Sequence, residues 1–396
     1  MIPKIAIVGG GAAGCFCSIE LRRRLPESEV TVFESGVKPM AKLALTGGGR
    51  CNLTNSFENI GNLSEAYPRG AQLMRRALCF FSNEDTCRWF EKEGVRLVVQ
   101  DDCCVFPVSQ DAMQIVRTLA SLMNRLGVNL QCNSRIPDIL PLLESYDSVV
   151  LCSGGGAVRM LDKLDIKIER LVPSLFSFNL PEDKIRELAG AVVENVSLGI
   201  AGTRFKSEGP LLVTDWGISG PAVLRLSSYA AVYLSEHNYE CDVIVNWTAG
   251  MNQNEVTDYL KTFLSSNGNK MLSSVHPPFL TSRLWNYLVR KCGVREDLRC
   301  SEAGSKTVNR LCGIFLTDSY RVRGKNRFKD EFVTCGGVSL SEINLSSCES
   351  KKYPGLYFAG EVLDVDAVTG GFNLQAAWST AMLAADSIIV NLSKNQ

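Results

Sequence analysis

The chain has 396 residues, in which 42 Lys and Arg residues balance 42 Asp and Glu residues. This neutral balance, without a basic tail, argues against nucleic acid as the main partner. No apolar run approaches the roughly 18 residues that span a bilayer, and no secretory leader is visible, so we expect a cytoplasmic protein without a membrane partner. The length exceeds one hydrophobic core, which predicts two or three domains.

The N-terminal segment carries the most specific pattern. An apolar strand at 5–8 leads into Gly9-x-Gly11-x-x-Gly14 and then a helix. In such a turn Gly9 permits a sharp bend, Gly11 lets the backbone approach a pyrophosphate, and Gly14 lets helix and strand pack closely. Glu34 ends the next strand about 20 residues later, where an acid binds the hydroxyls of an unphosphorylated ribose. The pattern therefore predicts a dinucleotide with its phosphates at the helix N-terminus.

Strands and helices alternate from there to about residue 165, as in a parallel sheet with crossovers. The pattern predicts a helical stretch over 70–93, a strand over 94–99 and a helix over 111–127. Two more strands follow, and the second ends in glycines 154–156. A small-residue turn of this kind places Gly154 near a cofactor in many dinucleotide folds.

The composition changes at about Lys167, where short strand-like runs with prolines begin. We predict an α/β protein with a discontinuous Rossmann-like FAD-binding domain, an inserted β-rich domain and a small helical subdomain. The predicted ranges are 1–166 with 330–396 for the FAD-binding domain, 167–250 with 311–329 for the β-rich domain, and 251–310 for the helical subdomain.

The pattern of the C-terminal segment predicts a second cofactor-binding unit. A strand ends in Gly360-Glu361, and Gly370-Gly371 precedes a long apolar helix. Glu361 could bind a ribityl hydroxyl of a flavin. The glycine turn would present N–H groups at a helix N-terminus to the pyrimidine edge, which gains electron density on reduction.

The fifteen cysteines are interpreted mainly as small buried hydrophobic residues of a protein from a reducing compartment. The sequence contains no Cys-x-x-Cys and only two histidines, so neither a metal site nor a redox dithiol is expected. We expect Cys51 to have a packing role rather than a nucleophilic one.

The strings LALTGGGRCNLTN, DWGISGPAVLRLS, VTCGGVSLSEIN and LYFAGEVLDVDAVTGGFNLQAAWSTA resemble a bacterial flavoprotein family of the BaiN/YhiN type. These are NAD(P)/FAD-dependent oxidoreductases of the aminoacetone oxidase type. The likeness covers essentially the whole chain, with the blocks in the same order. It implies bound FAD in a two-dinucleotide-binding-domain-like fold.

Carried over to this sequence, the resemblance assigns each part of the cofactor to a set of residues. Gly9, Gly11, Ala12, Ala13 and Gly14 would hold the pyrophosphate, and Glu34 and Ser35 the adenosine ribose. The ring and phosphate side would be lined by Lys42, Thr46, Gly48, Arg50, Cys51 and Asn52. Gly360, Glu361 and Asp364 would meet the ribityl and phosphate portion, and Gly371, Phe372 and Asn373 the flavin ring. Gly154 is also expected among the cofactor contacts.

Two positions depart from the family pattern. Cys103 and Cys104 stand where the family usually has Gly-Arg before Phe-Pro, and Ala367 stands where it commonly has glycine. The first change removes a cation from the region of the cofactor or substrate. We expect cofactor binding to survive both changes, whereas substrate preference is put in doubt.

The predicted function is an FAD-dependent oxidoreductase that acts on a small organic substrate by hydride transfer through the flavin. An activated C=C or C–N bond is the expected target, and NAD(P)H is a possible donor. One alternative is an RNA-modifying flavoprotein, and another is a flavin-binding protein with a regulatory role and little turnover. The sequence assigns no catalytic residue, no metal, no substrate and no oligomeric state.

Overall fold

A computed structural model of the protein describes residues 2–155, 158–325 and 333–394. The chain forms two compact units, Met1–Val172 with Val333–Gln396 (unit 1) and Pro173–Phe332 (unit 2). The predicted division of the inserted segment into a β-rich domain and a helical subdomain stays a prediction. Among the described residues, no helix is both long enough and apolar enough to cross a membrane.

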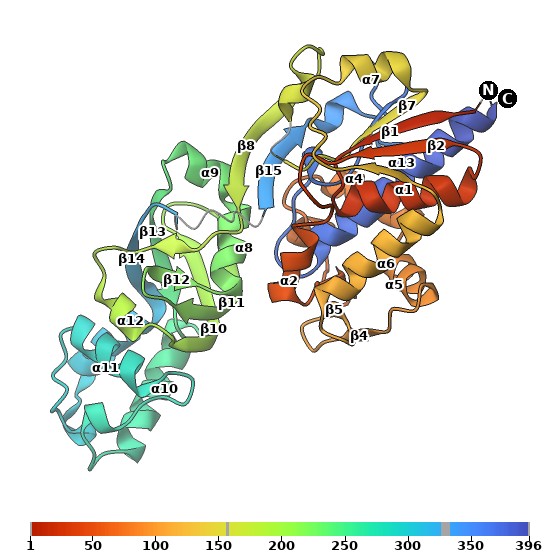
Figure 1. The fold of residues 1–396 in the computed structure, drawn as a ribbon. Coiled ribbons are helices and arrows are strands. Elements are labelled where there is room, and N and C mark those ends of the chain that lie inside the picture. The colour runs from red at the N-terminus through yellow and green to blue at the C-terminus, as the bar shows by residue number, and fades with distance from the viewer. Residues whose placement is uncertain (1, 156–157, 326–332, 395–396) are drawn as a thin grey trace. The chain divides into compact units, whose positions relative to one another are not determined.

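Unit 1 is built around a five-stranded parallel sheet (Figure 1). Val8, Phe33, Leu151 and Phe358 end four neighbouring strands in register, so these strands stop at one edge of the sheet. The predicted Rossmann-like α/β class is confirmed. In sheet order the strands are β16 (Leu356–Phe358), β7 (Ser148–Leu151), β1 (Lys4–Val8), β2 (Glu29–Phe33) and β6 (Asn129–Gln131).

Helices α1 and α13 lie alongside this sheet, whereas α4 and α5 contact α13 (Figure 1). The first and last helices contact each other, and the ring centroids of Phe16 and Trp378 are 5.4 Å apart. The two ends of the sequence therefore share one core. The bounds are α1 (Ala12–Arg24), α2 (Thr46–Gly49), α3 (Leu63–Ala66), α4 (Ala71–Phe80), α5 (Asn83–Lys92), α6 (Ala112–Arg125), α7 (Leu140–Ser145) and α13 (Phe372–Lys394).

The helical stretch predicted over 70–93 is two helices, because a capping box starts α5. The Ser82 hydroxyl accepts from the Asp85 N–H at 3.1 Å, and the Asp85 carboxylate accepts from the Ser82 N–H at 2.8 Å. These bonds satisfy donors at the helix start, so a new helix begins where the pattern suggests a continuous one.

A small antiparallel sheet takes the strand predicted over 94–99. It is formed by β3 (Thr54–Asn55), β5 (Cys104–Pro107) and β4 (Leu97–Val99), in that order. This strand therefore does not join the parallel sheet. Its exposed valines, Val98 and Val99, show that it lacks the two-sided burial of a central parallel strand.

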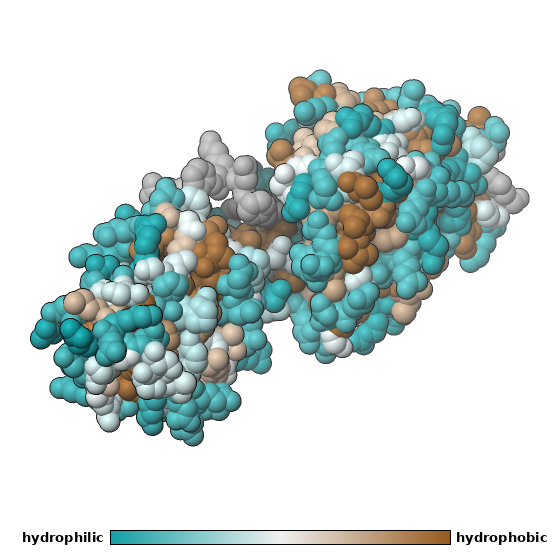
Figure 2. Space-filling model, turned by 90° about the horizontal axis from the view of Figure 1, so that it is seen from below, coloured by the Kyte–Doolittle hydropathy of each residue, from teal (hydrophilic) through white to brown (hydrophobic). Residues whose placement is uncertain are grey.

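Figure 2 shows one face of the molecule, on which hydrophilic residues predominate and hydrophobic residues form separate small areas. Among the exposed large hydrophobic residues, Val37 is 78% and Leu45 is 73% exposed. Both lie in the loop that follows β2. This loop connects the first glycine turn to the glycines at 47–49.

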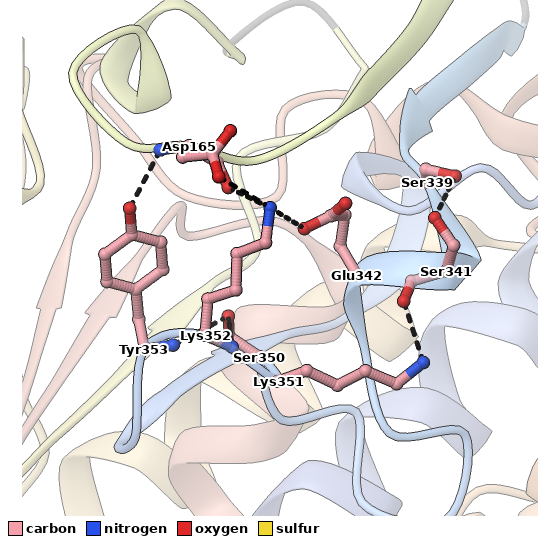
Figure 3. A network of polar contacts seen from close by, with 8 residues as sticks. All are labelled: Asp165, Ser339, Ser341, Glu342, Ser350, Lys351, Lys352 and Tyr353. Carbon is pink, nitrogen blue, oxygen red and sulfur yellow. Dashed lines mark hydrogen bonds and ion pairs between the residues drawn. The ribbon is translucent and has the colours of Figure 1, made fainter.

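A polar network holds the segment that leads from the parallel sheet to β8 (Ile168–Ser174) (Figure 3). Lys352 Nζ lies 2.9 Å from Asp165 Oδ2 and 3.1 Å from Glu342 Oε2, and the Asp165 N–H donates to the Tyr353 hydroxyl at 2.8 Å. The segment before β8 is thereby held to the segment between β15 and β16. The strands β8 (Ile168–Ser174) and β15 (Val333–Val338) pair with each other.

Unit 2 contains a six-stranded antiparallel sheet and five helices among its described residues. One hydrophobic core includes sheet and helix residues, among them Val243, Trp285 and Phe315. In sheet order the strands are β14 (Asp318–Arg323), β13 (Glu240–Asn246), β10 (Val192–Ile200), β11 (Lys206–Val213), β12 (Gly217–Ser219) and β9 (Phe178–Asn179). The helices are α8 (Pro221–Tyr229), α9 (Ala231–Glu236), α10 (Gln253–Ser266), α11 (Ser282–Lys291) and α12 (Ser305–Thr317).

A buried carboxylate connects the helices of unit 2 to this sheet. Asp318 accepts from the Tyr320 hydroxyl at 2.5 Å and from Trp247 Nε1 at 3.0 Å, and Lys291 Nζ lies 2.6 Å from its other oxygen. Burial raises the pKa of the Asp318 carboxyl, while Lys291 and the two hydrogen-bond donors favour its charged form. Lys291 is therefore the group that compensates a buried charge.

We expect Lys291→Met to destabilise unit 2 by about 2–3 kcal/mol, because it leaves the Asp318 carboxylate without its cation. Urea denaturation followed by tryptophan fluorescence measures the change. Replacing both partners, in Lys291→Met/Asp318→Asn, should restore part of the loss. A single variant as stable as the wild type would contradict the role given to the pair.

Candidate cofactor site

The turn after β1 has the geometry that its glycines predict. Gly9 has φ 110°, and a Cβ there would lie 2.5 Å from the Cys152 carbonyl oxygen. A Cβ on Gly14 would lie 2.0 Å from the Gly9 carbonyl oxygen. Both positions therefore exclude a side chain, Gly9 through its turn and Gly14 through close packing of α1 on the turn.

The N-terminus of α1 is open where a phosphate would approach. A Cβ on Gly11 would meet no atom within 4 Å, and Gly11 gives the helix no side-chain cap. Ala12 and Ala13 begin the helix, and its first turn contains no acidic residue. The N–H groups and the positive dipole end of α1 therefore suit an anion.

Glu34 lies beside this turn at the end of β2. Its Oε2 accepts from the Gly10 N–H at 2.8 Å, and its Oε1 accepts from the Gly36 N–H at 2.6 Å. The exposed Ser35 donates its hydroxyl to the same Oε1 at 3.3 Å. An ionised carboxylate has about four lone-pair sites, so Glu34 keeps capacity for ribose hydroxyls in addition to these donors.

The loop after β2 leads from the first turn to a second, glycine-rich turn. The Met40 N–H donates to the Gly10 carbonyl at 2.8 Å, and a short 3-10 helix follows at Leu43–Leu45. Gly47, Gly48 and Gly49 then have φ values of 58°, 67° and 85°. Three successive left-handed residues are accessible here because all three are glycine.

The other predicted residues of this loop divide into structural and exposed groups. The Thr46 hydroxyl donates to the Leu43 carbonyl at 2.7 Å, and its carbonyl accepts from the Cys51 N–H at 3.0 Å. Arg50 is exposed, with its guanidinium carbon 4.5 Å from the ring centroid of Phe106. Thr46 and Cys51 therefore hold the turn together, whereas Arg50 remains accessible.

Asn52 and its neighbours join the glycine-rich loop to the start of α13. With its amide oriented to satisfy both partners, Asn52 donates to the Thr54 carbonyl at 3.0 Å and accepts from the Gly371 N–H at 3.1 Å. The Thr54 hydroxyl donates to Gln375 Oε1 at 2.5 Å. A Cβ on Gly371 would lie 2.3 Å from the Thr54 carbonyl oxygen, so glycine permits this close approach.

Phe372 and Asn373 use their side chains within the protein. The Asn373 amide donates to the Ala367 carbonyl and accepts from the Ala367 N–H, both at 3.0 Å. Phe372 is buried, and its ring packs against Phe57 with centroids 5.1 Å apart. Contacts of this segment with a cofactor would therefore come from backbone N–H groups at the start of α13.

The remaining predicted residues lie beyond the ends of β7 and β16. Gly360 follows β16, and a Cβ on it would lie 3.0 Å from the Ala13 Cβ, which brings this strand against α1. Glu361 Oε1 accepts from the Thr334 N–H at 2.9 Å, and its Oε2 lies 3.7 Å from Lys42 Nζ. A Cβ on Gly154 would lie 3.5 Å from the same Glu361 oxygen.

An ion pair that the sequence analysis missed fixes the loop between β16 and α13. Arg69 donates through Nε and a terminal nitrogen to both carboxylate oxygens of the fully buried Asp366. Burial raises the pKa of the nearby Asp364 carboxyl, and the Asp366 charge raises it further. No local motif marks Arg69, because its partner lies almost 300 residues away in the sequence.

Two buried cysteines of the site, Cys51 and Cys104, are protonated at neutral pH. Burial raises the pKa of the Cys51 thiol to about 12 and that of Cys104 to about 11. Cys103 accepts a hydrogen bond from Asn59 Nδ2 at 3.0 Å. The thiolate is the reactive form of cysteine, so the protonated Cys51 and Cys104 thiols are poor nucleophiles.

These features define a class of protein. A parallel sheet, a glycine turn at its carboxyl edge, an uncapped helix N-terminus and an acid after β2 form a Rossmann-type dinucleotide site. All the predicted contact residues lie in unit 1. The open space at Gly11 fits a pyrophosphate, whereas the glycines at 9, 14 and 371 pack closely against the protein's own backbone.

The chain belongs to the family described as HI0933-like protein Rossmann domain, whose profile matches residues 3–387. It is 28% identical over 417 residues to a ribosomal RNA dihydrouridine synthase of Escherichia coli (strain K12), with 97% of each chain covered. It is 26% identical over 408 residues to a 3-dehydro-bile acid delta(4,6)-reductase of Clostridium scindens, covering 96% of this chain and 98% of that one.

Among solved structures, a 3-ketosteroid delta1-dehydrogenase from Sterolibacterium denitrificans aligns over 98% of this chain and 99% of its own, with a TM-score of 0.46 and 9% identity. The family confirms the resemblance predicted from the sequence. The family also confirms the predicted class of protein, which is a flavoprotein oxidoreductase with a Rossmann-type fold.

Two glycine variants should separate packing from cofactor binding. Gly14→Ala should destabilise unit 1 by about 3 kcal/mol, because its Cβ meets the Gly9 carbonyl. Gly11→Ala should change stability by less than about 1 kcal/mol. It should nevertheless bind FAD at least about tenfold more weakly, since its methyl group occupies the pyrophosphate approach. Thermal unfolding and FAD titration measure the two effects, and equal stability losses would contradict this assignment.

Alkylation of the native protein should distinguish the buried thiols from accessible ones. At neutral pH, iodoacetamide should modify the exposed Cys79 and leave Cys51 and Cys104 unmodified, because both thiols are buried and protonated. Peptide mass spectrometry gives the result, and the urea-unfolded protein serves as the control. Rapid labelling of Cys51 in the folded protein would show that it is a reactive thiol.

Proposed function

We propose that this protein is an FAD-dependent reductase of a C=C bond conjugated to a carbonyl group in a small organic substrate. The observation that carries the proposal is the connected edge of unit 1. It runs from the first glycine turn through the glycine-rich loop to the Asn52–Gly371 contact at α13. For the three parts of FAD, this edge offers a ribose-binding position at Glu34, an anion-binding position at the α1 N-terminus and a ring-edge position at the start of α13.

Each part of the edge has a chemical task in this proposal. The α1 N-terminus and the Gly11 backbone bind the pyrophosphate, and Glu34 accepts from the adenosine ribose. Glu361 lies beyond β16, where it accepts from ribityl hydroxyls. The N–H groups that begin α13 face the pyrimidine edge of the flavin, where they favour negative charge. When bound, FAD supplies the hydride donor and acceptor chemistry.

The relatives support a reductive direction. One is named for making dihydrouridine in ribosomal RNA and the other for reducing a 3-dehydro-bile acid at its 4,6 positions. A common chemistry for both names is hydride addition to a C=C bond that a carbonyl group makes electron-poor. We extend this chemistry to the present chain, with NAD(P)H as the proposed source of electrons.

RNA is the second candidate substrate. Residues 270–310 of unit 2 contain eight Lys and Arg residues against three Asp and Glu residues, although the whole chain is neutral. Several of these cations are already paired, as in Arg290–Glu296 and Arg295–Asp297. The local excess of positive charge favours a phosphate backbone as a partner. The paired cations and the neutral total charge favour the small molecule, which we therefore rank first.

Anaerobic flavin kinetics test the first proposal. The purified protein should be yellow, NADH or NADPH should bleach it, and 2-cyclohexen-1-one should restore its visible absorbance. Cyclohexanone, which lacks the C=C bond, is the matched control and should leave the flavin reduced. A protein that stays colourless with excess FAD would refute the cofactor, and a yellow protein that reacts with no enone would refute the reductase.

The same reduced enzyme distinguishes the second candidate. Unmodified ribosomal RNA is incubated with it, and nucleoside mass spectrometry measures dihydrouridine. Formation of dihydrouridine without enone turnover would replace the small-molecule proposal with the RNA one.

A further inference from the structure

Arg50 lies at the flavin-ring end of the predicted site and is held in place without a carboxylate partner. Its Nε donates to the Gly47 carbonyl at 3.1 Å, and its guanidinium stacks on Phe106. Phe106 is 3% exposed, so the ring is a rigid support. Within the described part of the chain, no acidic side chain forms an ion pair with Arg50, and Arg50 is exposed.

The surroundings of Arg50 are open and partly apolar. A Cβ on Gly48 or Gly49 would meet no atom within 4 Å, so the adjacent turn leaves free space. Leu45, at the start of the same turn, is 73% exposed. An exposed leucine and a pre-oriented guanidinium on the same loop suit a molecule that is apolar on one part and anionic on another.

The position of Arg50 favours substrate over the phosphates of FAD. The proposed pyrophosphate position is at the α1 N-terminus. The loop after β2 contacts this turn at Met40, whose N–H donates to the Gly10 carbonyl. Arg50 is two residues from Asn52, which contacts Gly371 at the start of α13. Arg50 therefore lies at the other end of the edge, beside the place proposed for the reacting ring.

We propose that Arg50 is a specificity-determining residue that binds an oxyanion of the substrate, a carboxylate or a phosphate, through its terminal nitrogens. The inference rests on the proposed function for the location of the ring. Arginine suits this task because its planar fork matches both groups bidentately, and stacking on Phe106 limits the entropy lost on binding. A lysine would supply the positive charge but not the planar pair of donor nitrogens that binds an oxyanion bidentately.

Ligand titrations of the FAD-loaded protein test the inference. Benzoate and inorganic phosphate are the anionic probes, and benzamide is the uncharged counterpart of benzoate. Binding is followed by the flavin absorption spectrum and by calorimetry. The wild-type protein should bind benzoate or phosphate. If it binds benzoate, its affinity for benzoate should exceed its affinity for benzamide. Arg50→Gln should weaken that binding at least about tenfold and leave benzamide unchanged, because a charge-assisted bidentate pair is lost. Arg50→Lys should be intermediate.

Arg75→Gln is the matched control, since it removes one positive charge from an exposed position of α4. It should bind both anions as wild type does. The inference is overturned if neither anion binds, if Arg50→Gln binds them equally well, or if Arg50→Gln loses FAD affinity instead, which would assign Arg50 to the cofactor. A wild-type protein that binds no flavin would refute the proposed function. In that case, calorimetry of the flavin-free wild type and Arg50→Gln still tests whether Arg50 binds the anion.

Discussion

The site depends on the hydrogen-bonded junction between the loop at 46–55 and the start of α13. Thr54 donates to Gln375, whose amide donates to Ser379 at 2.8 Å, and Trp378 Nε1 donates to the Leu53 carbonyl at 3.0 Å. These groups are buried, so breaking one bond would leave a polar atom unpaired at a substantial cost. The junction explains how two motifs more than 300 residues apart can form one edge.

The charges along this edge are arranged so that few are uncompensated. Glu34 is bound by backbone N–H groups, and Glu361 has Thr334 and the distant Lys42. Asp366 is paired with Arg69 below the surface. A ligand therefore meets an edge whose acids are already oriented by the protein. Two positive features of this edge that remain accessible are the α1 N-terminus and Arg50.

Sequence alone predicted the parts of this arrangement that are local. The turn at Gly9–Gly14 and the acid at position 34 follow from short-range sterics and spacing. The Arg69–Asp366 pair could not be predicted, because no pattern connects residues so far apart. The role of Asn373 was also hidden, since its amide is used by Ala367. The break between α4 and α5 was readable from Ser82 and Asp85, but the apolar periodicity on both sides obscured it.

The presence of Cys103-Cys104 in place of Gly-Arg affects the charge of the region around Arg50. Cys104 lies on β5, two residues before the Phe106 that supports the Arg50 guanidinium. Burial raises the pKa of the Cys104 thiol to about 11, so it carries no charge at neutral pH. A second arginine at that position would repel Arg50 or share its ligand. With a neutral thiol at position 104, the oxyanion site that we propose would depend on the stacked Arg50 rather than on two neighbouring arginines.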